Sequence, residues 1–133
     1  MLPAFHDGLL CGLSVAETTA TLALVEVDGR RWTVELTGVS YLKADDFRQG
    51  NVVLDLAVVT GEPPPRAWLE QLLPAPHPEV AAAYHDAHRA HLDELEAGIA
   101  AGALTLVVLS PSYGCELLAI CEGCRGVELP QPL

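Results

Sequence analysis

Apolar and polar residues alternate along the first part of the chain, which is the pattern of half-buried β-strands. The alternation predicts strands over 9–16, 20–27 and 30–38. In the first strand the apolar face consists of Leu9, Cys11, Leu13 and Val15. In the third strand it consists of Trp32, Val34 and Leu36. One apolar face on each strand is typical of an antiparallel sheet that covers a core on one side.

Two short segments predict how these strands are connected. Asp28-Gly29 is a hairpin signal, because both central residues of a type I′ turn need φ > 0, which Asp tolerates and Gly adopts freely. Residues 41–50 break the alternation and predict a loop with a helical turn. Residues 51–61 then resume as a long strand that is apolar on both sides except at Asp55.

The middle of the chain changes to a helical pattern after a run of three prolines, which cannot continue a strand ladder. A short helix is predicted over 66–73. A longer helix is predicted over 78–102, because it begins with a proline, is rich in alanine and ends at a glycine. The strand pattern returns over 103–110, 115–121 and 125–129.

This order of elements predicts one α+β domain over residues 1–133, with strands over 9–60, a helical segment over 66–101 and strands over 103–129. Strands joined by hairpins favour a mostly antiparallel sheet of about six to seven strands, with the two helices packed on one face. The alternative is a strongly curled or partly closed sheet.

The charge of the chain narrows the classes of partner. The formal net charge is −11, with 18 acidic residues, seven basic residues and a single lysine, Lys43. Nucleic-acid binding needs clustered cations, as does binding to an anionic membrane, so neither partner is expected. A negative surface attracts a basic protein instead, although acidity of this size also serves solubility alone.

The hydrophobic content of the chain and its N-terminal residues indicate where in the cell the protein is expected. Half of the residues are hydrophobic, which is enough for a core, and no apolar run reaches the ~18 residues that a membrane span needs. The N-terminal residues lack the basic start and apolar stretch of a secretory signal. We therefore expect a cytoplasmic protein with four reduced cysteines. The oligomeric state is left open.

Two thiols near the C-terminus are candidates for chemistry. Cys121 and Cys124 flank Glu122-Gly123, and a hairpin with this two-residue turn would place the thiols across its first rung. That arrangement resembles one half of a zinc knuckle. A redox pair is less favoured, because no helix follows Cys124 to lower the thiol pKa.

The long helix supplies two further zinc ligands in this hypothesis. At ~100° per residue, a stripe that faces the sheet contains Val80, Tyr84, His88, His91, Leu95 and Ile99. His88 and His91 would complete a Cys2His2 set with Cys121 and Cys124. The alternative is that both histidines are partly buried and hydrogen-bonded, and that the cysteines act as small hydrophobic residues, with no cofactor.

Three other residues are weaker candidates. His6 lies beside Asp7, and a carboxylate can orient an imidazole for base chemistry, but neighbours on an extended chain point to opposite faces. Asp55 interrupts an apolar strand, so it is either functional or exposed to water. No Gly-x-Ser-x-Gly elbow or phosphate loop is present, and no residue set indicates a catalytic centre.

Residues 5–60 carry a resemblance to known proteins. The opening FHDGLLCGLSV and the later VDGRRWTVELTGVSYLKADDFRQGNVVLDL resemble a group of small uncharacterised bacterial β-rich proteins with a Phe-His-Asp start. Some of these are similar to immunity proteins that neutralise polymorphic toxins. The resemblance implies a protein whose acidic surface covers a basic site on a toxin.

Two functions follow as expectations. The first is a non-enzymatic, cytosolic bacterial domain that binds another protein, with an immunity-like role. The second is a zinc-binding or hydrolytic domain that uses His88, His91, Cys121 and Cys124. The first predicts a broad acidic or apolar surface, and the second predicts these side chains within reach of one another in one pocket.

Overall fold

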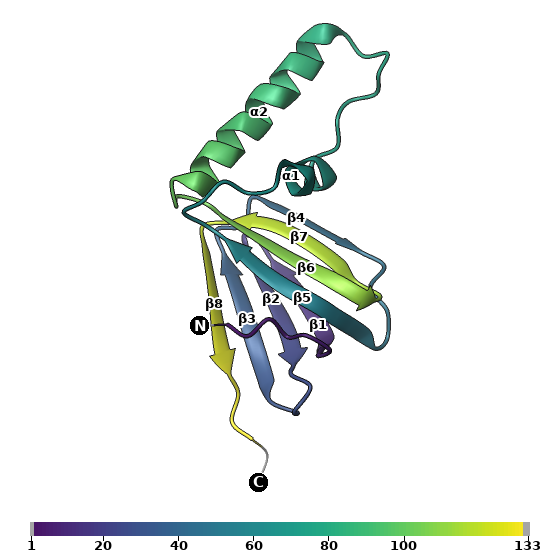
Figure 1. Cartoon of the computed structure of the whole chain (residues 1–133), viewed down its shortest axis with the longest axis vertical. Coiled ribbons are helices and arrows are strands. Elements are labelled where there is room, and N and C mark those ends of the chain that lie inside the picture. Colours follow the sequence, from purple (N-terminus) through teal and green to yellow (C-terminus); the bar gives the residue numbers. More distant parts are fainter. Residues whose placement is uncertain (1, 132–133) are drawn as a thin grey trace.

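The structure is a computed structural model and describes residues 2–131. Eight strands and two helices are present in this range. The strands are β1 (Leu9–Ala16), β2 (Thr19–Val25), β3 (Arg31–Thr37), β4 (Tyr41–Asp45), β5 (Asn51–Val59), β6 (Thr105–Tyr113), β7 (Glu116–Cys121) and β8 (Gly123–Glu128). The helices are α1 (Arg66–Leu72) and α2 (Ala82–Ala100). The expected α+β class is confirmed (Figure 1).

All neighbouring strands pair antiparallel, in the order β4-β7-β6-β5-β1-β2-β3-β8. The strand count exceeds the expected six to seven. One reason is that residues 41–45, predicted as part of a loop, form β4 and pair with β7. The sequence of this segment is not alternating, and its strand conformation comes from that pairing.

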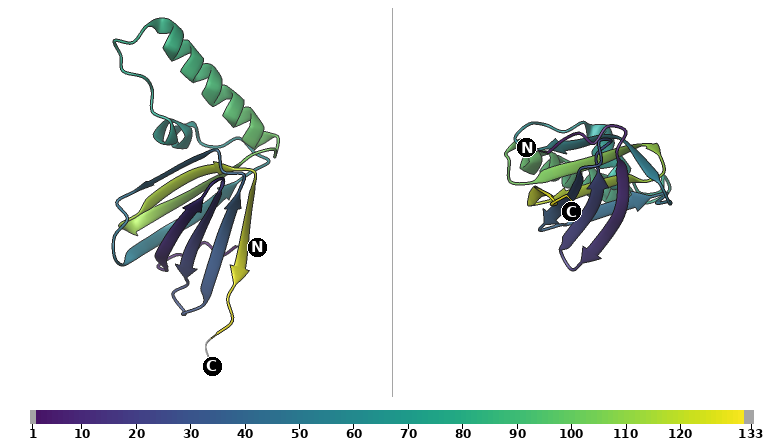
Figure 2. Two further views of the ribbon diagram at one scale, coloured as in Figure 1. Left: turned by 180° about the vertical axis from the view of Figure 1, so that it is seen from behind. Right: turned by 90° about the horizontal axis from the view of Figure 1, so that it is seen from below.

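The sheet is strongly curled, because two pairs of consecutive strands each form one long, bent strand. β3 runs into β4 across residues 38–40, and β7 runs into β8 across Glu122. β3 pairs with β8 while β4 pairs with β7. β4 and β8, which stand at the two ends of the strand order, therefore belong to two long bent strands, β3–β4 and β7–β8, that pair with each other. Figure 2 shows the resulting curvature from behind and from below.

The curled sheet encloses the larger of two apolar clusters, here called the interior cluster. Its buried members include Leu22, Leu24, Val34, Leu36, Val53, Leu109, Leu117 and Cys121. The burial of Val34 and Leu36 confirms the predicted apolar face of β3. The predicted face of β1 is right for Leu13, which packs against the interior cluster, but wrong for Leu9, Cys11 and Val15, which are exposed, while Leu10 is buried instead. A bulge between Leu10 and Gly12 shifts the alternation there.

The second cluster, here called the helix-side cluster, lies on the outer face of β5, β6 and β7. It joins that face to the two helices, and its buried members include Leu69, Leu72, Leu92, Leu95, Ile99, Leu106, Leu118 and Ile120. The helices therefore pack on one face of the sheet, as expected. Only the second half of α2 takes part, and its first half projects beyond the sheet (Figure 1).

The start of the long helix differs from the prediction. α2 begins at Ala82, not at Pro78, and residues 74–81 form a loop. Val80 and Tyr84, which the helical stripe placed against the sheet, are exposed. The first half of α2 extends past the sheet, so its apolar residues have no sheet surface to pack against there. Neither helix combines the length and apolar composition of a membrane span within residues 2–131.

The hairpin between β2 and β3 lies where Asp28-Gly29 predicted it. Its geometry differs from a type I′ turn, because only Gly29 of the pair has positive φ (93°). The Gly29 amide donates to the Glu26 carbonyl at 2.9 Å, and the Glu26 amide donates to the Arg30 carbonyl at 2.7 Å. The strands are therefore connected by a loop longer than two residues, and its left-handed glycine gives a backbone geometry compatible with the twist of the two strands.

Candidate functional site

The two helix histidines are half-buried and hydrogen-bonded. His88 Nε2 donates to the carbonyl of Leu73 at 2.8 Å, which ties α2 to the end of α1. His91 Nε2 shares a hydrogen bond of 2.8 Å with the Tyr41 hydroxyl on β4. Both rings therefore hold the helices to each other and to the sheet.

The expected hairpin at Glu122-Gly123 is wrong, because β7 and β8 do not pair with each other. Cys121 pairs with Thr105 of β6, and Cys124 pairs with Leu36 of β3. The Glu122 amide donates to the Thr37 carbonyl at 2.9 Å, so the ladder continues through the segment that was expected to turn. The two thiols therefore lie on consecutive parts of one bent strand.

The structure does not bring the cysteines and histidines together. Cys121 belongs to the interior cluster, whereas its neighbour Ile120 belongs to the helix-side cluster. Tyr41, the partner of His91, packs with the helix-side cluster, so His91 and the Cys121 thiol lie on opposite faces of the sheet. Within residues 2–131, no three or more His, Cys, Asp or Glu side chains are grouped to hold a metal ion.

The thiols are held in the protonated form. Burial raises the pKa of Cys121 to about 11, from an ordinary value of 9.0. Burial also raises the pKa of Cys124. For Cys115, which is fully buried, burial is the main cause of a raised pKa and the charges of Asp45 and Asp46 add to it. Because the thiolate is the reactive nucleophile, these thiols are poorly suited to nucleophilic chemistry at neutral pH.

His6 and Asp7 lie side by side on the surface, with 3.5 Å between Nε2 and Oδ2. His6 Nδ1 also donates to the Leu54 carbonyl at 2.8 Å. The preceding residue, Phe5, is buried and makes an edge contact with Trp32, with ring centroids 6.0 Å apart. These contacts hold the N-terminal segment along β5, so the Phe-His-Asp start has a structural role.

Asp55 is exposed although β5 lies inside the sheet. The register between β5 and β6 shifts between Val53 and Asp55, and this irregularity turns the carboxylate toward water. Of the two alternatives that the sequence left open, the structure therefore places Asp55 at the surface.

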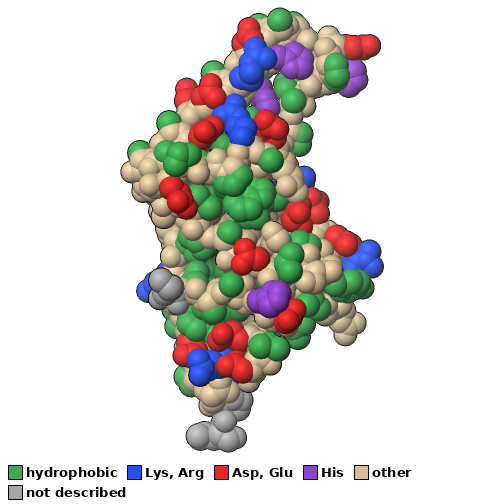
Figure 3. All heavy atoms as spheres, in the orientation of Figure 1, with side chains coloured by type: hydrophobic (Ala, Val, Ile, Leu, Met, Phe, Trp, Pro, Cys, Tyr) green, Lys and Arg blue, Asp and Glu red, His purple; other side chains and the backbone are tan. Residues whose placement is uncertain are grey.

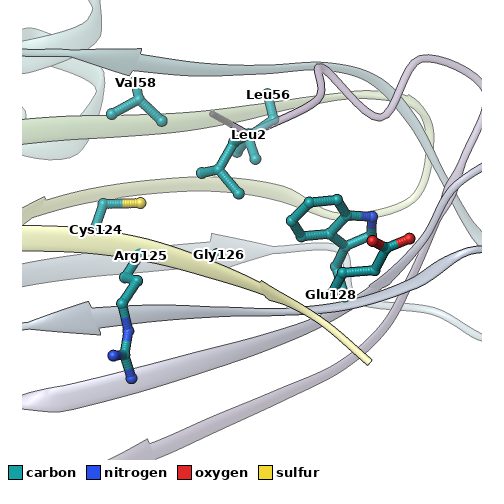
Figure 4. Close-up of a pocket in the computed structure, with 8 residues that line it drawn as sticks. Leu2, Leu56, Val58, Cys124, Arg125, Gly126 and Glu128 are labelled. Carbon is teal, nitrogen blue, oxygen red and sulfur yellow. The ribbon is translucent and has the colours of Figure 1, made fainter. Parts of the chain in front are cut away.

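A pocket of about 760 Å3 opens between β5 and β8 and is called here the β5–β8 pocket (Figure 4). Its apolar wall consists of Leu2, Trp32, Leu56 and Val58. The opposite side is β8, which contributes Cys124, Arg125, Gly126 and Glu128. Arg125 extends away from the pocket in Figure 4 and lies 3.9 Å from Glu35 on the neighbouring strand.

Sequence reasoning did not identify this pocket. Its walls come from the N-terminal segment, from two strands far apart in sequence and from Trp32 on β3. The one sequence feature that could have indicated the pocket was Val58, an apolar residue in a strand that is apolar on both sides. It is 39% exposed, so β5 presents an apolar side chain to water inside the curl of the sheet.

The surface carries little free positive charge. Every lysine and arginine except Arg31 forms an ion pair with a carboxylate, and Arg31 donates instead to the carbonyl of Pro130. Exposed acids with no cationic partner among the described residues include Glu17, Asp55, Glu62, Glu70, Glu94 and Glu122. Figure 3 shows most basic side chains next to acidic ones on the visible face.

No family model matches this chain, and no curated protein or solved structure shows significant similarity to it.

Proposed function

We propose that this chain is a non-enzymatic protein-binding domain of the bacterial cytoplasm whose partner presents a basic surface. The observation that carries the proposal is the distribution of charge. Every basic side chain except Arg31 is paired with a neighbouring acid, while exposed carboxylates without a cationic partner within residues 2–131 occur on both the helices and the sheet. Such a surface produces a negative field that speeds encounter with a cationic protein.

The resemblance of residues 5–60 to proteins similar to toxin immunity proteins supports a toxin as this partner. An inhibitor of this kind acts by covering a basic site, and it needs no catalytic residues of its own. The hydrogen-bonded histidines and protonated thiols are compatible with that role, since each has a structural partner or a buried position.

The test begins with the partner. Immobilised full-length protein retains proteins from an extract of the source cells, and the retained protein is then purified and its binding measured separately. We expect a basic partner whose association rate falls by about tenfold or more from low to high salt, because screening removes the steering field. A neutral or acidic partner, or a rate that does not depend on salt, would contradict the proposal.

Two triple variants then locate the surface. One neutralises Glu62, Glu70 and Glu94 on the helical end, and the other neutralises Glu17, Asp55 and Glu122 on the sheet. Each variant removes the same formal charge, so they control for net charge. We expect one of them to slow association more than the other. Association that is unchanged in both would contradict binding through the negative surface.

A further inference from the structure

The second half of β1 has one side without a neighbouring strand. β5 pairs with β1 only at Leu9 and Leu10, and beyond these two residues no strand within residues 2–131 pairs with that side of β1. Side chains on both faces of this half are exposed, at Ser14, Val15 and Ala16. In the view from below in Figure 2, the hairpin of β1 and β2, drawn in purple and dark blue, extends from one side of the sheet.

Residues 12–16, here called the β1 edge, lack the features that protect a sheet edge. Natural edge strands avoid pairing with other chains through charged side chains, prolines or bulges. The whole of β1, with the sequence LLCGLSVA, contains no charged residue and no proline. The bulge of this strand lies before Gly12, so the β1 edge itself keeps a regular register with β2.

The absence of charge on β1 favours a second copy of this chain as the occupant. The formal net charge of −11 makes two copies repel each other, and the repulsion is weakest where an uncharged strand meets an uncharged strand. A basic protein would gain no ion pair from the side chains of β1. Two identical strands can also pair antiparallel about a two-fold axis, so that each copy makes the same contacts.

An apolar groove lies at the other end of the same strand. This groove, here called the β1 groove, has a volume of about 550 Å3 and is lined by Leu9, Leu10, Cys11 and residues 47–50. Phe47 in the groove is 48% exposed, and Val15 at the end of β1 is 56% exposed. In an antiparallel pair the end of one strand lies beside the start of the other. Val15 of each copy would therefore cover the β1 groove of the other copy.

The charges at the two ends of β1 are complementary in the same arrangement. Arg48 lines the β1 groove, and Glu17 directly follows the last residue of β1. Arg48 Nε donates to Asp46 at 2.6 Å, which leaves the other donors of the guanidinium for a second carboxylate. Glu17 is exposed and has no cationic partner among the described residues. Antiparallel pairing brings Glu17 of each copy toward Arg48 of the other.

We infer that this chain forms a two-fold symmetric dimer in which the β1 edges of two copies pair antiparallel. Val15 of each copy packs at the β1 groove of the other, and Glu17 of each copy pairs with Arg48 of the other. The dimer goes beyond the proposed function and does not depend on a basic partner.

Sedimentation velocity of the unmodified protein tests the dimer. We expect the mean mass to rise from one chain to two between about 1 and about 100 µM, because a short strand pair beside a small groove gives micromolar affinity at best. NMR-detected hydrogen exchange locates the contact. Within residues 12–16, the amides that point away from β2 should exchange about fivefold or more slowly at the higher concentration. A monomer throughout, or a dimer without this protection, overturns the inference.

A charge exchange tests the ion pair between copies. We expect Glu17→Arg and Arg48→Glu each to weaken the dimer about tenfold or more, because each places like charges together. The double variant should restore association to within about threefold of the unmodified protein. Glu17→Arg also lowers the net negative charge, so its effect is opposite to that of a change in overall repulsion. A double variant that stays as weak as both single variants overturns the pairing.

Two valine variants provide a matched comparison. Val27 is 77% exposed and lies outside β1, in the hairpin between β2 and β3. We expect Val15→Arg to weaken the dimer about tenfold or more and Val27→Arg to change it by less than about twofold, although both add the same charge. Thermal unfolding checks that the variants fold. The exchange measurement uses the unmodified protein, so it remains decisive if a variant does not fold.

The remaining outcomes also decide the inference. Equal effects of the two valine variants overturn it. A chain that stays monomeric alone, but whose residues 12–16 are protected when a basic partner binds, also overturns it, because the occupant of the β1 edge is then that partner. A dimer with the expected protection supports the inference whether or not a basic partner is found.

Discussion

The hydroxyl of Tyr41 on β4 lies 2.8 Å from Nε2 of His91 on α2, and the two rings meet edge to face with centroids 5.7 Å apart. A second polar tie lies beside it, where Nζ of Lys43 donates to the carbonyl of Gln71 in α1 at 3.2 Å. Together these contacts hold both helices to the strand at one end of the sheet. They explain why α2 stays in place although half of its length projects beyond the sheet.

Removal of the Tyr41 hydroxyl tests this contact. We expect Tyr41→Phe to lower the free energy of unfolding by about 1 kcal/mol, because the half-buried His91 loses its partner while the aromatic ring remains. Tyr84→Phe is the matched control, since Tyr84 is 66% exposed on the projecting half of the same helix, and it should change stability by less than about 0.5 kcal/mol. Urea unfolding measures both. Equal effects in the two variants would show that the hydrogen bond does not stabilise the fold.

Asn51 is a buried polar residue whose side chain joins three parts of the chain. Its Oδ1 accepts from the amides of Arg48 and Cys115 at 2.7 Å and 3.0 Å, and its Nδ2 donates to the carbonyl of Leu10 at 3.2 Å. We expect Asn51→Ala to cost about 2–4 kcal/mol, because these groups lose their partner in a buried place.

Gln49→Ala, in the exposed loop beside it, is the control for Asn51→Ala and should leave stability within about 0.5 kcal/mol of the unmodified protein. Urea unfolding with an unchanged m-value measures the difference. A loss below about 1 kcal/mol in Asn51→Ala would mean that water replaces the side chain at these groups.

Stability should fall in alkaline solution because of Cys121. Its thiol is protonated in the folded state up to about pH 11, whereas the unfolded chain ionises it near its ordinary value of 9.0. The buried, protonated thiol therefore makes its full contribution to the free energy of unfolding below pH 9. This contribution is lost as the pH rises to about 11, and the loss is about 2–3 kcal/mol at most.

Urea unfolding at a series of pH values measures this decline. Cys121→Ala should flatten it in part, since the raised pKa values of Cys115 and Cys124 act in the same direction. Cys11→Ala is the control, because Cys11 is exposed, and it should retain the full decline. The same slope in all three proteins would show that burial of Cys121 does not control the alkaline loss.

The zinc hypothesis also has a direct test. Because His91 and the Cys121 thiol lie on opposite faces of the sheet, we expect no stoichiometric zinc in protein purified without added metal. Elemental analysis measures the content. One zinc per chain that is lost on both His88→Ala and Cys124→Ser would establish the Cys2His2 set and contradict the arrangement described above.

Several local features of the fold were predictable from the sequence. Alternation identified β3 and the side on which Val34 and Leu36 are buried, and the glycine of Asp28-Gly29 located a hairpin. The helical stripe correctly placed Leu95 and Ile99 against the sheet. These features depend on residues close in sequence, whose burial repeats with the period of the strand or helix.

The pairing of distant strands was not predictable in this way. The pattern of 115–129 indicated two strands, and the hairpin expected for Cys121 and Cys124 assumed that consecutive strands pair. β8 instead pairs with β3, and the β5–β8 pocket exists only because of that choice.

The sequence alone thus determined most of the segments that become strands or helices, together with the apolar face of β3 and of the second half of α2, because these depend on the spacing of side chains along the chain. Only the tertiary structure decided which strand edges meet, that β8 pairs with β3, and that His91 and Cys121 face opposite sides of the sheet. The physical reason is that an apolar face is buried equally well against several partners. The choice among them depends on packing and curvature of the whole sheet.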